Sequence, residues 1–123
     1  MSDTIMIDVL TLDSLQCAAC TYMMESIAAL PQQIQDVICY REWSIKTRAG
    51  VDKFVEMKGR VLPTIAIQGD LIFESMIPQY EDLIDAMAER APTEELGTAI
   101  RDVRGIGFDF EQIETNLAKA RSD

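Results

Sequence analysis

The start of the chain places an apolar strand directly ahead of a helix, and this pair restricts the folds open to it. Residues 4–12 are dense in β-branched and aliphatic side chains, and Asp8 is the only charge among them. Such a run is typical of a central strand in a sheet that helices cover. Residues 18–30 then carry apolar side chains at helical spacing, and Pro31 ends that stretch. A buried strand followed at once by an amphipathic helix predicts an α/β fold.

The chain continues this alternation as far as its third helix. We expect a second strand over residues 37–43, a second helix over 47–57, a hairpin of strands 63–67 and 71–74, and a third helix that Pro78 opens. Because a helix lies between the first two strands, they should pair in parallel. The predicted order is βαβαββα, with a mixed four-stranded sheet and helices on both faces. The second helix is expected to bury the following apolar side chains: Val51, Phe54, Val55 and Met57.

Residues 91–123 form a C-terminal extension in which two further short helices are predicted. Leu96 and Ile100 recur at helical spacing, and Asp109 caps a second helical stretch, with Gln112 closing a capping box. Helices this short are marginal alone. They must therefore pack on the preceding domain, on a partner or on a second copy of the chain, so a homodimer through the C-terminal helices is one alternative.

Cys17 and Cys20 lie three residues apart at the head of the first predicted helix. A thiol at the first turn of a helix meets unpaired backbone N–H groups and the positive end of the helix dipole, and both favour the thiolate. We therefore expect the pKa of Cys17 to be lowered and Cys17 to be nucleophilic near neutral pH. Cys20 lies one turn further on, where it can attack a mixed disulfide formed on Cys17. This spacing predicts a reversible dithiol–disulfide couple.

A second unusual element is Leu62-Pro63-Thr64, which places a proline at the opening of a later strand. Two cysteines three apart after a first strand, together with this Leu-Pro-Thr, resemble the thioredoxin superfamily. The closer likeness is to its small thioredoxin- or glutaredoxin-like proteins. The resemblance covers residues 4–90. It implies that residues 1–90 are a thioredoxin-like domain with the thioredoxin fold.

The resemblance also implies roles for individual residues. In that family the proline is cis and lies against the cysteine pair, so Pro63 is expected to be cis and the backbone of Leu62 to bind an extended substrate segment. Asp8 is a candidate proton acceptor for Cys20; the alternative is a strand carboxylate that reaches solvent. The implied protein is an oxidoreductase that reduces or exchanges protein disulfides, with electrons from an upstream donor of the thioredoxin-reductase type. On this interpretation no resident cofactor or metal is expected.

The Cys-Ala-Ala-Cys motif departs from the family pattern at its centre. Thioredoxins typically hold Gly-Pro between the cysteines and glutaredoxins Pro-Tyr, whereas Ala18-Ala19 stands here. The reduction potential therefore does not carry over. Glutaredoxin-like families also show a glycine pair after the last strand that helps to hold glutathione. Residues 74–78 contain no glycine, which disfavours glutathione as the electron donor.

Charge and composition exclude several other classes of function. The chain has 11 basic and 21 acidic side chains and a net charge of −10, which argues against nucleic acid or an anionic membrane as the main partner. It has no histidine, so histidine-based catalysis and zinc ligation by histidine are excluded. The sequence shows no apolar run of about 18 residues and no basic leader. We therefore expect no membrane span, no signal peptide and a cytoplasmic protein.

Two other functions fit the same residues. Cys17 and Cys20 would also serve a metal- or iron–sulfur-binding module, with Cys39 of the second strand as a third ligand. Otherwise Cys39 is expected to be a buried, inert thiol that packs as a small apolar side chain. The second alternative is a non-catalytic interaction domain, in which the C-terminal helices dock on a larger enzyme.

Overall fold

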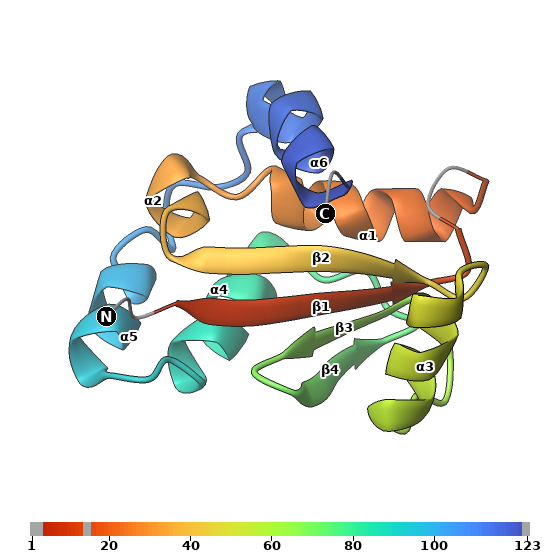
Figure 1. Ribbon diagram of the computed structural model, residues 1–123. Coiled ribbons are helices and arrows are strands. Elements are labelled where there is room, and N and C mark those ends of the chain that lie inside the picture. The colour runs from red at the N-terminus through yellow and green to blue at the C-terminus, as the bar shows by residue number, and fades with distance from the viewer. Residues whose placement is uncertain (1–3, 14–15, 122–123) are drawn as a thin grey trace.

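The computed structural model describes residues 4–13 and 16–121, and this part of the chain contains four strands and six α-helices (Figure 1). The predicted α/β class is confirmed. The elements in chain order are β1 (Ile5–Thr11), α1 (Ala18–Ala28), α2 (Gln32–Gln35), β2 (Ile38–Ser44), α3 (Arg48–Glu56), β3 (Thr64–Ile67), β4 (Asp70–Glu74), α4 (Tyr80–Glu89), α5 (Glu94–Arg101), the 3₁₀-helix η1 (Phe110–Gln112) and α6 (Ile113–Arg121).

The four strands form one mixed sheet in the order β2-β1-β3-β4. β1 pairs in parallel with β2 and antiparallel with β3, and β4 returns antiparallel beside β3. Apart from Met6, every residue of β1 is buried, as its apolar sequence predicts for a central strand. Gln68 and Gly69 both have positive φ, as a two-residue hairpin turn between β3 and β4 requires. The predicted four-stranded mixed sheet and its parallel first pair are confirmed.

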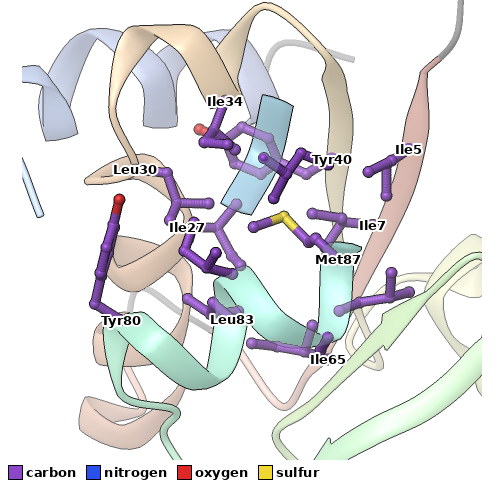
Figure 2. Close-up of a cluster of buried hydrophobic side chains, with 14 of the residues drawn as sticks. Ile5, Ile7, Ile27, Leu30, Ile34, Tyr40, Ile65, Tyr80, Leu83 and Met87 are labelled. Carbon is purple, nitrogen blue, oxygen red and sulfur yellow. The ribbon is translucent and has the colours of Figure 1, made fainter. Parts of the chain in front are cut away.

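One face of the sheet forms the main hydrophobic core with α1 and α4 (Figure 2). Ile7 of β1 points to this face, and the strand registers align it with Tyr40 of β2 and Ile67 of β3. Ile27 of α1 and Leu83 of α4 pack on these side chains and are themselves fully buried. This packing fixes α1, and with it the cysteine pair at its start, against the sheet.

Helix α3 lies on the opposite face of the sheet (Figure 1). Asp8 and Trp43 belong to the alternate set of strand side chains, which points away from α1 and α4. The ammonium of Lys53, which is part of α3, lies 5.1 Å from the centroid of the Trp43 ring. Helices therefore cover both faces of the sheet, but α3 covers its own face mainly at the end where β2 stops.

The predicted apolar side of α3 is wrong for two of its four residues, Val51 and Val55, whereas Phe54 and Met57 are half-buried. Val51 and Val55 are 42% and 69% exposed, and of the residues in α3, all of which are described, Gly50 alone is buried. A Cβ at Gly50 would come within 1.7 Å of the Ser44 carbonyl oxygen, so the helix meets the sheet through its first turn. Because α3 is held there, Val51 and Val55 face outward.

Two further differences concern helix ends. Helix α2 is not predicted by the sequence, because an apolar period cannot be recognised over four residues. Pro78 is expected from the sequence to open α4 at its first turn, but α4 begins two residues later, at Tyr80. Instead Gln79 is the N-cap, and the Asp82 side chain accepts its backbone N–H to complete a capping box.

The C-terminal helices pack on the rest of the chain. α5 contacts α4, and α6 contacts both α1 and β2. The Asp109 backbone N–H donates to the Ala29 carbonyl at 2.6 Å, and the Asn116 side-chain amide donates to the Ala28 carbonyl at 2.9 Å. The carbonyl groups at the end of α1 are therefore bound by the segment that leads into α6 and by α6 itself.

The cap at Asp109 is only partly as predicted. Its side chain does accept a backbone N–H, from Glu111 at 3.1 Å. The Gln112 side chain, however, donates to the Asp109 carboxylate at 2.9 Å and not to the backbone that a capping box involves. The reason is that the Asp109 N–H already donates to the Ala29 carbonyl, so it is not available to the Gln112 side chain.

Candidate dithiol site at the start of α1

A turn after β1 sets Cys17 as the N-cap of α1. The Asp13 carbonyl accepts the backbone N–H groups of Gln16 and Cys17 at 3.0 and 2.8 Å. Cys17 itself has extended backbone angles, with φ −109° and ψ 111°, and its carbonyl accepts the Thr21 N–H at 2.9 Å as the first helical bond. The predicted position of Cys17 at the head of the helix is confirmed.

The sulfur of Cys17 acts as the capping atom. It accepts the backbone N–H of Cys20 at 3.2 Å, a bond that hydroxyl or carboxylate oxygens usually make at helix starts. An acceptor in this place gains from carrying negative charge, because it faces unpaired N–H groups and the positive end of the helix. The geometry therefore favours the thiolate form of Cys17.

The two cysteines have opposite pKa shifts. The pKa of Cys17 lies below its ordinary value, because the thiol and the backbone N–H of Cys20 both donate to its sulfur. Partial burial and the Asp13 carboxylate act against this lowering without reversing it. The pKa of Cys20 lies above its ordinary value, first because burial disfavours its thiolate and second because its thiol donates to Cys17.

Burial divides the pair in the same way. Cys17 is partly exposed, whereas Cys20 is fully buried beneath it. An external disulfide can therefore reach Cys17 and not Cys20, while Cys20 remains in hydrogen-bonding distance of the sulfur that would carry a mixed disulfide. The arrangement suits one thiol for attack and the other for resolution.

The Leu62–Pro63 peptide bond is cis, as the resemblance implied. Thr64, which follows it, pairs with Leu10 near the end of β1. Because β1 and β3 are antiparallel, Pro63 comes at the end of the sheet from which the chain leaves β1 toward Cys17. The Pro63 carbonyl also accepts the Ser75 N–H at 2.7 Å, which brings the segment after β4 to the same place. The structure thus gathers both sequence motifs at one end of the sheet.

Exposed apolar side chains surround this end of the sheet. They lie on the segments that follow β1 and β4, on the segment before Pro63 and on the first turns of α1. We call this set the apolar rim, and its members are Leu12, Tyr22, Val61, Met76 and Ile77. The rim is not predicted from the sequence, because the exposure of a side chain depends on which elements pack against it in the folded chain. Proximity to the two motifs is the one signal that would have indicated it.

Asp8 does not come near the cysteine pair. It lies on the face of the sheet opposite α1, and its carboxylate accepts the Trp43 indole N–H at 2.7 Å. The charged groups that act on the Cys20 thiol do not include it. It does not reach solvent either, since it is 9% exposed. Because side chains of a strand alternate between the two faces of the sheet, Asp8 points away from the face on which Cys20 is buried.

Cys39 is exposed, so its expected burial is wrong. It pairs with Met6 at the start of β1, whereas Cys17 follows the end of β1, and β2 is an edge strand. The structure therefore does not bring Cys39 to the other two cysteines. Within the described parts of the chain, no group of three or more Cys, Asp or Glu side chains is arranged to hold a metal ion.

Comparison with known proteins gives no family assignment: no family model matches the sequence, and no curated protein and no solved structure matches the chain. In residues 4–13 and 16–121, no helix is long and apolar enough to cross a membrane. The function must therefore be inferred from the chemistry of the site.

Proposed function

We propose that this protein is a thiol–disulfide oxidoreductase with a thioredoxin fold, in which Cys17 attacks a protein disulfide and Cys20 resolves the product. The opposite pKa shifts of two sulfurs within hydrogen-bonding distance carry the proposal. A lowered pKa makes Cys17 reactive near neutral pH, and a raised pKa keeps Cys20 protonated until it is needed.

The arrangement of the sheet supports the proposed fold. The strand order β2-β1-β3-β4, the parallel first pair and helices on both faces match the βαβαββα plan that the resemblance implied. The cis bond before Pro63 stands at the same end of the sheet as the cysteines. The apolar rim supports a polypeptide as the substrate, because an extended segment bound at Leu62 would cover those side chains from water.

The reaction proceeds in two displacements. The Cys17 thiolate attacks one sulfur of the substrate disulfide, the substrate S–S bond breaks, and its leaving thiolate takes a proton from water. Cys20 then gives its proton to water and attacks the Cys17 sulfur, which breaks the mixed disulfide and releases the second substrate sulfur as a thiolate that takes a proton from water. The substrate gains two electrons and two protons, and the protein is left with a Cys17–Cys20 disulfide. An upstream dithiol donor of the thioredoxin-reductase type, in the cytoplasm, returns both electrons.

Mass spectrometry after thiol alkylation tests whether the couple exists. Protein treated with a mild oxidant should gain two alkylated thiols only after dithiothreitol, and both should map to Cys17 and Cys20. The C39S variant is the matched control and should give the same two sites. If all thiols react without reductant after oxidation, the proposal fails. If they react only after a chelator is added, a metal-binding module replaces it.

A further inference from the structure

We propose that Lys46 is a positioning residue of the dithiol site: from the loop between β2 and α3, its ammonium holds the turn before Cys17 and offsets the Asp13 charge. The inference rests on the proposed function to the extent that it treats Cys17 as the nucleophile. It adds a residue outside both sequence motifs, one that reaches the site only through the fold.

The contacts of Lys46 reach two residues of that turn. Its Nζ donates to the Gln16 side-chain oxygen at 3.0 Å and lies 3.9 Å from an Asp13 carboxylate oxygen. Gln16 directly precedes Cys17, and the Asp13 carbonyl accepts the Cys17 N–H. One ammonium therefore contacts both the residue before the nucleophile and the residue whose backbone fixes it.

The loop that carries Lys46 is itself fixed to the end of β1. The Ile45 N–H donates to the Thr11 carbonyl at 2.9 Å, and the Ser44 hydroxyl donates to the Leu12 carbonyl at 2.9 Å. The Lys46 N–H in turn donates to the Ser44 hydroxyl oxygen at 3.2 Å. Because the backbone is held in this way, only side-chain freedom is lost when Lys46 contacts the turn.

The charges around Cys17 give this contact a chemical consequence. The Asp13 carboxylate raises the pKa of Cys17, so a cation bound to Asp13 acts in the opposite direction. From α1 the facing group is the Cys20 thiol. At the same end of the sheet, Arg60 and Glu74 bind each other through two hydrogen bonds and largely cancel. Lys46 is therefore a cation placed to offset Asp13.

The K46M variant tests the inference through the pH profile of Cys17 alkylation, followed by mapping of the modified peptide. The midpoint of the profile should move to higher pH, and the rate near neutral pH should fall about twofold to fivefold, as expected for loss of a partly exposed ion pair. The loss should shrink in about 1 M salt. K46R should restore most of the rate. R48M, which removes a neighbouring cation paired with Asp52, is the matched control and should leave the profile unchanged.

A second variant separates charge from packing. If Lys46 acts by offsetting Asp13, D13N in the K46M background should return the midpoint to the wild-type value or below it. The inference is overturned if the pH profile of Cys17 alkylation is the same in K46M as in R48M. It is also overturned if D13N does not restore the alkylation midpoint that K46M shifts. Failure of the proposed function is distinct: Cys17 and Cys20 would then form no disulfide, whatever Lys46 does to the alkylation rate of Cys17.

Discussion

Two helices of this protein begin with a side chain that caps the helix after two neighbouring strands, and only one of these caps is a thiol. At the end of β2, the Thr47 hydroxyl oxygen caps α3 by accepting the N–H of Gly50 at 3.0 Å. At the end of β1, the Cys17 sulfur caps α1 by accepting the N–H of Cys20 at 3.2 Å. β1 and β2 are parallel neighbours, so both helices follow strands that end at the same end of the sheet, and both caps have extended backbone angles.

The difference between the junctions shows how the same capping position can carry either an oxygen or a sulfur. Oxygen side chains are the preferred N-caps, and Thr47 supplies one. A sulfur is a poorer cap, but the N–H group that completes the helix end also stabilises a thiolate. The third residue after the cap also has a structural role in one helix and a chemical role in the other. Gly50 lets α3 approach the sheet closely, whereas Cys20 supplies the second sulfur of the proposed couple.

Replacing Cys17 by serine should give the largest functional change. C17S keeps an oxygen cap and loses the nucleophile, so disulfide reduction should fall to background while the Tm does not fall. Turnover of a model protein disulfide and thermal melts of both proteins check this. If C17S still reduces disulfides, Cys17 is not the nucleophile. If C17S melts clearly below the wild type, an oxygen does not replace the sulfur as the cap of α1.

The G50A variant should give the largest loss of stability at the second junction. The added Cβ would meet the Ser44 carbonyl oxygen at 1.7 Å, and this atom belongs to the backbone and cannot move aside freely. We expect a loss of about 3 kcal/mol in the free energy of unfolding, the upper end of the usual cost of overpacking. G105A is the matched control, because open space surrounds Gly105. Urea unfolding of the two variants should separate them; equal stability contradicts the close approach of α3.

Removing the oxygen cap of α3 should have a smaller effect. T47A loses the bond to the Gly50 N–H, and the free energy of unfolding should fall by about 1 kcal/mol. T47S, which retains the capping oxygen, should lie close to the wild type in the same urea titration. If T47A is as stable as T47S, the cap at α3 contributes nothing and the two junctions differ more than proposed.

The smallest expected effect is a pH dependence of stability that belongs to Cys17. Its folded pKa is lowered, so the reduced wild type should gain stability over C17S as pH rises from that pKa toward the ordinary value of 9.0, and lose it as pH falls. Below pH 9.0 the raised pKa of Cys20 keeps its thiol protonated, so the difference isolates Cys17. Urea unfolding of both proteins across this window measures it. A difference that stays flat or falls with rising pH contradicts the lowered pKa.

Local patterns account for the parts of the fold that the sequence predicts. The apolar run of β1, the helix start at Cys17 and the hairpin of β3 and β4 each depend on neighbouring residues, and all three are as expected, except that β4 begins one residue earlier, at Asp70. Which side of α3 is buried depends instead on the close approach of Gly50 to the Ser44 carbonyl. The spacing of apolar residues along the sequence cannot predict this tertiary contact.

The features of the candidate site also fall into those that local sequence predicts and those that depend on tertiary structure. The positions of Cys17 and Pro63 follow from where each lies relative to its own strand. Cys39 is exposed because it lies on the same face of the sheet as α3 but beside Met6, at the end where β2 begins and which α3 does not cover; the sequence does not specify where on this face α3 lies. The contact between Lys46 and Asp13 joins two loops and is likewise a property of the assembled sheet.

The most direct test of the account is to trap the first intermediate. With Cys20 replaced by serine in a C39S background, Cys17 remains as the nucleophile but cannot be released. We predict that this protein forms a stable covalent adduct with a disulfide-containing protein, that dithiothreitol breaks it, and that peptide mapping places it on Cys17. Absence of the adduct, with Cys17 still reactive toward alkylating reagents, would contradict the proposed attack on disulfides.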